Sequence, residues 1–222
     1  ALVGMNGSID WLCLPRIDSP SVFASILDDK KGGYFKIAPA AEGFSEKQLY
    51  WPETNVLITR FLSPDGVGEV RDFMPIEAAP DELGRGRLVR IVTTDRGSMA
   101  FRLECYPAFD FARADHEIEL GAGGATFNSK GLSLGLESSV PLTKKGAGVT
   151  AEFTLREGQT AVFALGEHEA GASSESPLSQ QAAADLFTST VNYWRRWLSK
   201  CTYTGRWREM VQRSALALKL MT

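Results

Sequence analysis

The stretch MAFRLECY, residues 99–106, carries the pattern that decides the fold. Met99, Phe101, Leu103 and Cys105 alternate with Ala, Arg, Glu and Tyr. Successive side chains of a β-strand point to opposite faces, so a period of two places these four residues on one face. The stretch therefore predicts a strand with one buried face.

The same strand-like pattern extends to both sides of this stretch. Alternation recurs, and apolar β runs follow one another, in residues 55–62, 67–73, 87–94, 132–136, 149–155 and 160–165. Pairs that favour tight turns separate the runs: Asn6-Gly7, Gly32-Gly33, Asp65-Gly66 and Glu157-Gly158. Short strands with regular turns and no helical interludes predict antiparallel sheets packed as a sandwich of roughly ten to fourteen strands.

The pattern changes after Gly166. Residues 167–177 have the composition of a linker, and Ser176 or Ser179 is a suitable cap for a helix that follows. Apolar residues then recur at three- and four-residue steps, first at Ala183, Leu186, Phe187, Val191, Trp194 and Trp197 or Leu198, and, after Gly205, at Trp207, Met210, Val211, Ser214, Leu218 and Met221. These steps predict two amphipathic helices, the second running to Thr222. We expect both helices to be poorly anchored, the apolar face of the second to be exposed, and the natural polypeptide to continue into a helical domain.

Composition excludes several classes of function. The chain has 222 residues, 44% hydrophobic and 23% charged, with a net charge of −3 and charges of both signs interspersed. This balance predicts a globular protein without a surface for nucleic acid or an anionic membrane. No stretch has the length of a membrane span, and no signal-peptide pattern opens the chain. Three widely spaced cysteines, Cys13, Cys105 and Cys201, predict reduced thiols and a cytoplasmic location.

No pattern predicts a metal, a cofactor or a nucleophilic triad. His116 and His168 lie about fifty residues apart without paired ligand spacing. The glycine-rich residues 121–124 do not join a strand to a helix, so they predict a hairpin and not a phosphate-binding loop. Adjacent carboxylates, such as Asp28 and Asp29, are explained by solvated turns.

The most distinctive segment is GSIDWLCLPRIDSPSVF, residues 7–23. Trp11, Arg16 and Asp18 place an indole, a guanidinium and a carboxylate within eight residues, beside the rigid Pro15. An indole can stack on a pyranose and ionic groups can bind its hydroxyls, so the three are candidate sugar-binding residues. The alternative is that Trp11 is a core residue and that Arg16 pairs with Asp18 to brace the turn.

This segment resembles the opening signature of family 15 glycoside hydrolases, of the bacterial glucoamylase and trehalase-like kind. A second resemblance, to the junction with the catalytic domain of that family, lies in residues 193–197, 201–203, 205–207 and 213–220. One departure is Ile17, where the family pattern has Phe. The resemblance implies an N-terminal β-supersandwich in residues 1–170, a linker with an amphipathic helix in 171–204, and the first helix of a truncated (α/α)6 barrel in 205–222.

The resemblance also implies the activity. Members of this kind hydrolyse α-glucosidic bonds with inversion, using two carboxyl groups roughly 6.5–9.5 Å apart. In the family both lie in the barrel, so no catalytic residue transfers to this sequence and we expect the chain alone to be inactive. The implied partner is an α-glucoside or oligosaccharide substrate, with trehalose, maltooligosaccharides and dextran-like substrates all open, and homo-oligomer formation is also open. The alternative is a noncatalytic carbohydrate-binding or structural β-sandwich.

Overall fold

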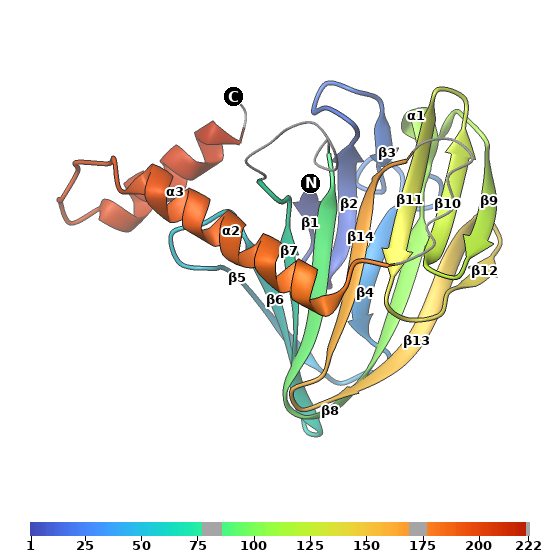
Figure 1. Cartoon of the computed structure of the whole chain (residues 1–222), viewed down its shortest axis with the longest axis horizontal. Helices are drawn as coiled ribbons and strands as arrows, with labels where there is room; N and C mark the ends of the chain where they lie inside the picture. The colour runs from blue at the N-terminus through green and yellow to red at the C-terminus, as the bar shows by residue number, and fades with distance from the viewer. Residues whose placement is uncertain (77–85, 169–176, 221–222) are drawn as a thin grey trace.

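The computed structural model of the chain describes residues 1–76, 86–168 and 177–220. Antiparallel strands form two layers around one core, and two long helices follow the last strand (Figure 1). The strands are β1 (Leu2–Val3), β2 (Ser8–Cys13), β3 (Ser21–Phe23), β4 (Tyr34–Pro39), β5 (Ser45–Tyr50), β6 (Leu57–Ser63), β7 (Gly66–Phe73), β8 (Leu88–Tyr106), β9 (His116–Gly121), β10 (Gly124–Ser129), β11 (Leu132–Ser138), β12 (Thr143–Lys145), β13 (Gly148–Arg156) and β14 (Thr160–Glu167). The predicted mainly β fold, an antiparallel sandwich followed by helices, is confirmed.

Strand β8 belongs to both layers. Its first half pairs with β7 and β14, and its second half, from Ser98 onward, pairs with β4 and β13. Between the halves Gly97 has a φ of 72°, and a Cβ at this position would lie 2.1 Å from the carbonyl oxygen of Asp65. The prediction of two separate strands in 87–94 and 99–106 is therefore wrong, because glycine lets one strand turn the corner between the layers.

The core lies between the two layers. Phe101, Leu103 and Cys105 are fully buried and Met99 is nearly so, which confirms the face predicted from MAFRLECY. The residues that meet them from the other layer include Val70, Val92, Phe127, Leu136 and Phe163. Burial of this kind supplies most of the free energy that stabilises a sandwich, at about 1.5–3 kcal/mol for each large apolar side chain.

Helix α2 (Gln180–Leu198) covers the outer face of the layer that contains β7, β14 and the first half of β8 (Figure 1). Its apolar stripe and the outward residues of the sheet form a second cluster, which includes Val89, Ile91, Val162, Ala183 and Val191. The expectation that both helices are poorly anchored is wrong for α2, because a strip of sheet with apolar residues on both faces lies beneath it.

The start of α2 follows a local capping rule, whereas α3 starts at Trp207 without a side-chain cap. The Ser179 side chain accepts a hydrogen bond from the Ala182 N–H at 3.1 Å, so Ser179 is the N-cap of α2 and Ser176 lies outside the described residues. The second predicted helix is α3 (Arg208–Lys219), with Leu220 at its C-cap; residues 221 and 222, to which it was expected to extend, lie outside the described residues. The domain limits at residues 170 and 204 stay predictions.

Candidate functional site

The segment after β2 forms a turn that is closed by an ion pair. Arg16 Nε–H donates to Asp18 Oδ1 at 2.8 Å, and Arg16 Nη2 also bonds the second carboxylate oxygen. Two further hydrogen bonds join Arg16 and Ser19: the Arg16 N–H donates to the Ser19 side-chain Oγ at 3.2 Å, and the Ser19 N–H donates to Arg16 O at 3.1 Å. The hydrogen bond from Arg16 lowers the pKa of the Asp18 carboxyl. This geometry agrees with the alternative interpretation, in which Arg16 pairs with Asp18 to brace the turn. The ion pair joins two of the three candidate residues.

The pair is at the same time well exposed. The side chains of Arg16 and Asp18 are 74% and 62% accessible, and Ile17 between them is 76% accessible. Exposed ion pairs contribute little to stability because water and salt screen them. The turn therefore displays one apolar and two charged groups at the surface, which is compatible with a contact to another molecule or domain.

Trp11, the third candidate, makes its aromatic contact elsewhere. It lies on β2, is partly buried, and its ring centroid is 6.1 Å from that of Phe111 at an interplanar angle of 43°. Phe111 is 40% accessible and belongs to α1 (Phe109–Ala112), a single turn packed against β3. The structure thus pairs Trp11 with a residue that sequence analysis missed, and not with the ion pair of the neighbouring turn.

The turn α1 has an unusual backbone. Asp110, Phe111 and Ala112 have φ values of 51°, 57° and 62°, in the left-handed region, although none is glycine. Each such residue costs about 1–2 kcal/mol, so three in succession need strong support from their surroundings. The sequence signal was weak, since only the order Phe-Asp-Phe after Pro107 marks the turn.

Arg113 supplies part of that support. Its Nε–H donates to Asp110 O at 3.0 Å and its Nη2–H to Asp110 Oδ1 at 2.7 Å. The guanidinium carbon lies 5.4 Å from the centroid of the Phe111 ring. On the other side Phe109 is buried in the core and lies 5.2 Å from the ring of His116. The turn is therefore held at both ends, with Phe111 outward and Phe109 inward.

A buried arginine ties the beginning of the distinctive segment to the core. Arg90 is fully buried; its Nε–H donates to Asp72 Oδ1 at 2.7 Å, Nη1–H to Phe35 O at 2.6 Å and Nη2–H to Gly7 O at 2.8 Å. A buried charge is stable only when it is paired and hydrogen-bonded, as here. Arg90 therefore fixes the Asn6-Gly7 turn that leads into β2.

A second buried carboxylate, Glu69, is also engaged by arginines. Its Oε1 accepts from Arg60 Nε–H at 2.7 Å and its Oε2 from Arg71 Nη2–H at 3.2 Å. Arg71 in turn lies 5.6 Å from the ring centroid of Trp51 and 5.9 Å from that of Phe187. This network connects the sheet to α2.

Helix α3 is attached on one side by polar contacts. Arg213 Nη1–H donates to Thr54 O at 2.7 Å, Nη2 bonds the Asn55 side-chain oxygen, and the guanidinium carbon lies 3.9 Å from the Tyr50 ring centroid. Asn55 Nδ2–H donates to the carbonyl of Leu216 at 3.1 Å. We call these four residues, Tyr50, Thr54, Asn55 and Arg213, the α3 clamp.

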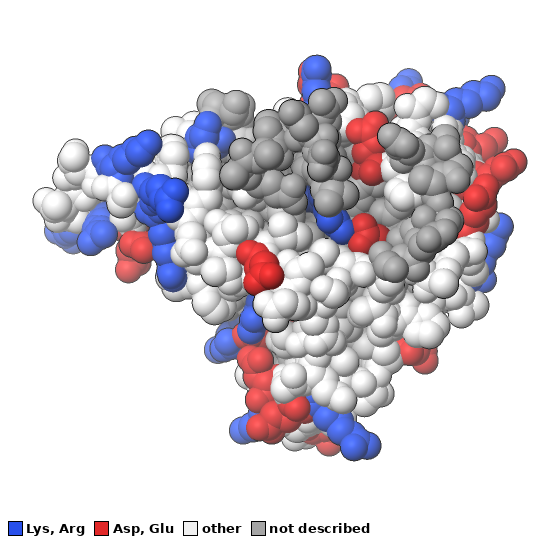
Figure 2. All heavy atoms as spheres, in the orientation of Figure 1, with Lys and Arg blue, Asp and Glu red and all other residues white. Residues whose placement is uncertain are grey.

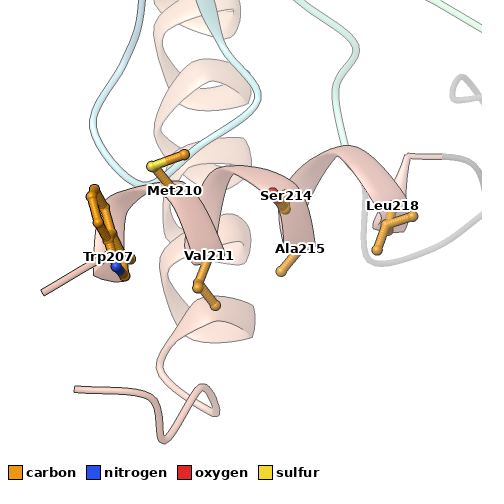
Figure 3. A pocket seen from close by; sticks show the side chains of 6 residues that line it. All are labelled: Trp207, Met210, Val211, Ser214, Ala215 and Leu218. Atoms are coloured by element: carbon orange, nitrogen blue, oxygen red, sulfur yellow. The ribbon is translucent and has the colours of Figure 1, made fainter. Parts of the chain in front are cut away.

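The other side of α3 is apolar and open, as the sequence predicted. Trp207, Met210 and Leu218 are 53%, 64% and 63% accessible. With three smaller neighbours they line one shallow hollow along the helix (Figure 3): Trp207, Met210, Val211, Ser214, Ala215 and Leu218. An exposed apolar stripe on a fixed helix is typical of a surface that another element covers.

The helical part of the chain is basic. Residues 195–219 contain seven Arg and Lys residues and one acidic residue, Glu209. Figure 2 shows Lys and Arg gathered on the projecting helices, whereas Asp and Glu are more frequent over the sandwich. The charges are thus less evenly interspersed in space than the composition suggested.

Two further titratable residues, Cys105 and His116, lie in buried or partly buried positions. Burial raises the pKa of the Cys105 thiol and lowers that of His116, which contacts Ala147 O at 3.0 Å. Residues 121–124 join β9 to β10 as the predicted hairpin. Within residues 1–76, 86–168 and 177–220, no group of three or more His, Cys, Asp or Glu could hold a metal ion. Neither α2 nor any other described helix combines the length and hydropathy needed to cross a membrane.

Comparisons with known proteins cover the whole chain. A family model described as trehalase-like, N-terminal, matches residues 1–162. The trehalase of Thermoplasma acidophilum is 34% identical over 224 residues, which cover 99% of this chain and 38% of that protein. The trehalases of Thermoplasma volcanium and Mycobacterium tuberculosis are 33% and 29% identical, and the alignments cover 99% and 100% of this chain but 35% of each relative. The chain thus spans less than two fifths of the length of these relatives.

Proposed function

The chain belongs to the family of trehalase-like N-terminal domains, and from this premise we propose that it is the N-terminal part of an enzyme that hydrolyses α-glucosidic bonds. The observation that carries the proposal is the alignment with a trehalase over 99% of the chain, which takes in the sandwich and both helices. The finer assignment, to family 15 of the glycoside hydrolases with an inverting mechanism, is supported by the two sequence motifs.

The reaction needs two carboxyl groups, one to protonate the leaving oxygen and one to activate water. We place both outside this chain. In support, the buried carboxylates among the described residues are Glu69 and Asp72, and each is bound by arginine. A carboxylate held in such a pair has no free oxygen facing a cleft, so neither residue is suited to act as general acid or base.

We further propose that α3 is the first helix of an (α/α)6 barrel. The supporting observation is its division into two sides: the α3 clamp binds it to the sandwich, and the apolar side is left for other helices. In this arrangement the sandwich sets the position of the first barrel helix.

The segment from Trp11 to Asp18, with Trp11, Arg16 and Asp18 as its candidate residues, is proposed as the contribution of the sandwich to the substrate entrance. The test is Arg16→Ala and Asp18→Ala in the enzyme that contains this chain. A substrate contact predicts that kcat/KM falls much more than the melting temperature. A turn that is merely braced predicts lower stability with unchanged activity per folded molecule, and that result would remove the turn from the site.

The hydrolase itself is tested by glucose release from trehalose and maltose. We expect the polypeptide that contains this chain to release glucose, with the anomeric carbon attacked by water first seen by NMR in the β configuration, so that trehalose initially gives one β- and one α-glucose. We expect the 222-residue chain to release none. Retention of configuration would contradict the family 15 mechanism. Activity of the chain alone would contradict the placement of the carboxylates.

A second candidate is a noncatalytic sugar-binding module, and the surface pair of Trp11 and Phe111 favours it. The two candidates differ in one measurement. Sugar binding by the chain, combined with no hydrolysis by the polypeptide that contains it, would replace the first candidate by the second.

We also propose a location and binding partners for the protein. We propose a cytoplasmic location, supported by three cysteines that form no disulfide. The proposed partner is an α-glucoside and not a nucleic acid or a membrane. When the 222-residue chain is studied alone, without further helices over α3, homo-oligomers would form through the open side of α3.

A further inference from the structure

Two aromatic side chains from distant parts of the sequence meet at the surface of the sandwich. Trp11 comes from β2, where it pairs with Leu2 on β1, and Phe111 comes from the turn α1. Their ring planes are tilted by 43°, and Phe111 is 40% accessible. Phe111 is thus partly open to solvent, with the Arg113 guanidinium carbon 5.4 Å from its ring centroid.

The backbone under this pair is costly. Phe109 anchors the turn in the core, and three non-glycine residues in succession adopt left-handed conformations and turn Phe111 outward beside Trp11. Strain of this kind is concentrated where a side chain must be presented in one direction. A bulky aromatic residue at the centre of the strained run, directed to the surface, is the feature that calls for a function.

Polar groups suited to a neutral ligand flank the rings. Asp110 and Arg113 form an ion pair at 2.7 Å and are 43% and 67% accessible. Within the described residues, the hydrogen bonds of Arg113 use two of its five N–H donors. Because the pair is neutral as a whole, it offers donors and acceptors without selecting a charged ligand.

We propose that Trp11, Asp110, Phe111 and Arg113 form a binding site for one pyranose ring of an α-glucoside on the surface of the sandwich. The choice of an α-glucoside rests on the proposed function. Stacking on an aromatic face suits the apolar face of a sugar ring, and charged donors and acceptors form strong hydrogen bonds with its hydroxyls. The site thus explains the outward direction of Phe111 and the position of Arg113.

The test uses the 222-residue chain with maltotriose and trehalose as probes, titrated while the indole N–H signals are followed by NMR. The Trp11 signal, assigned with Trp11→Phe, is expected to shift. Phe111→Ala is expected to weaken binding about tenfold, the size of one lost stacking contact. The matched control is Trp207→Ala, which removes an aromatic side chain of 53% accessibility from α3 and is expected to leave binding unchanged. Equal affinity in wild type and Phe111→Ala, or no shift at all with either sugar, would overturn the site.

A second variant separates the backbone strain from the two rings. Ala112→Gly keeps both aromatic side chains and lets residue 112 hold the same left-handed backbone without the Cβ cost, so we expect a higher melting temperature with the affinity retained. A severalfold loss of affinity in this variant would contradict a site that consists of the two rings and the ion pair. Hydrolysis by the complete enzyme is measured separately: if it is present while the chain binds neither sugar, only the site is wrong, and if it is absent while the chain binds, only the hydrolase proposal is wrong.

Discussion

The helices α2 and α3 follow each other in the chain and have similar amphipathic patterns, but they are held in different ways. The apolar side of α2 is buried, with Ala183 inaccessible and Val191 6% accessible, whereas Met210 on α3 is 64% accessible. The difference lies in the neighbours, since α2 lies on an apolar strip of sheet, whereas α3 meets the sandwich through polar contacts, the α3 clamp and the Arg208–Glu53 pair, and buries Leu216 mainly against α2. An amphipathic pattern thus shows which side of a helix is apolar and leaves open what covers it.

The two attachments differ in strength as well. Each large apolar side chain buried under α2 contributes about 1.5–3 kcal/mol. Each hydrogen bond of the α3 clamp contributes a net of about 0.5–1.5 kcal/mol, because water competes for the same groups. We therefore expect α2 to unfold with the sandwich and α3 to open independently.

The largest effect is expected from truncation. A chain ending after residue 176 lacks α2 and exposes Val89, Ile91 and Val162 to water. We expect a loss of more than about 5 kcal/mol, which is the entire stability of many domains. Urea denaturation and binding of the dye ANS measure the loss of stability and the exposed apolar surface.

The control is a chain ending after residue 205, which lacks only α3. It is expected to keep a cooperative transition, with a lower midpoint because Trp194 and Leu198 lose their contact with Leu216. This order is the opposite of what two poorly anchored helices would give. Equal stability of the two truncated chains would contradict the difference between the helices.

The second prediction concerns one contact under α2. Phe187 makes edge-to-face contacts with Trp51 and Phe73, at 5.2 Å and 5.8 Å between ring centroids. Phe187→Ala is expected to cost about 2–4 kcal/mol in chemical denaturation, since it leaves a cavity between helix and sheet. Leu218→Ala on the open side of α3 is the matched control, with an expected change within about 0.5 kcal/mol. Similar losses in the two variants would mean that α3 is as firmly packed as α2.

A third prediction addresses the α3 clamp. Arg213→Ala removes the hydrogen bonds to Thr54 and Asn55, and we expect α3 to lose about 1–2 kcal/mol of local stability. Amide hydrogen exchange should become faster in α3 while α2 stays as protected as before. Arg208→Ala is the control, since Arg208 is 3.8 Å from Glu53 and both are exposed. Unchanged exchange in α3 would show that the clamp does not hold the helix.

Much of the fold could be predicted because its determinants are local. The alternation in residues 99–106 and the turn pairs indicate strands, and the steps from Ala183 to Leu198 indicate α2. The continuity of β8 could not be predicted, because it depends on which strands pair on either side of Gly97. The packing of α2 on the sheet could not be predicted for the same reason. The sheet residues beneath α2 come from four separate segments, including Val56 and Ala164.

The candidate site could be predicted only in part. The Arg16–Asp18 pair is a contact over two residues, which sequence spacing can suggest. The contact of Trp11 with Phe111 spans a hundred residues and depends on left-handed backbone at three positions. Statistical preferences disfavour such a backbone for Phe and Ala, so no local pattern could have indicated it.

Substitutions on the open side of α3 are expected to have the smallest effect on stability. We expect them instead to weaken the association between copies of the chain. Met210 and Leu218 are more than 60% accessible, so replacing both by Ser removes apolar surface that the folded chain does not bury. We expect Met210→Ser with Leu218→Ser to change the free energy of unfolding by less than about 1 kcal/mol. Contacts between copies that use this surface should weaken, because association through an apolar patch depends on the area removed from water. Sedimentation velocity over a range of concentrations measures the change, with Leu120→Ser on β9 as a control of comparable exposure at 48%. If the wild-type chain and the control associate while the double variant stays monomeric, the open side of α3 is the interface, and equal association of all three would place it elsewhere.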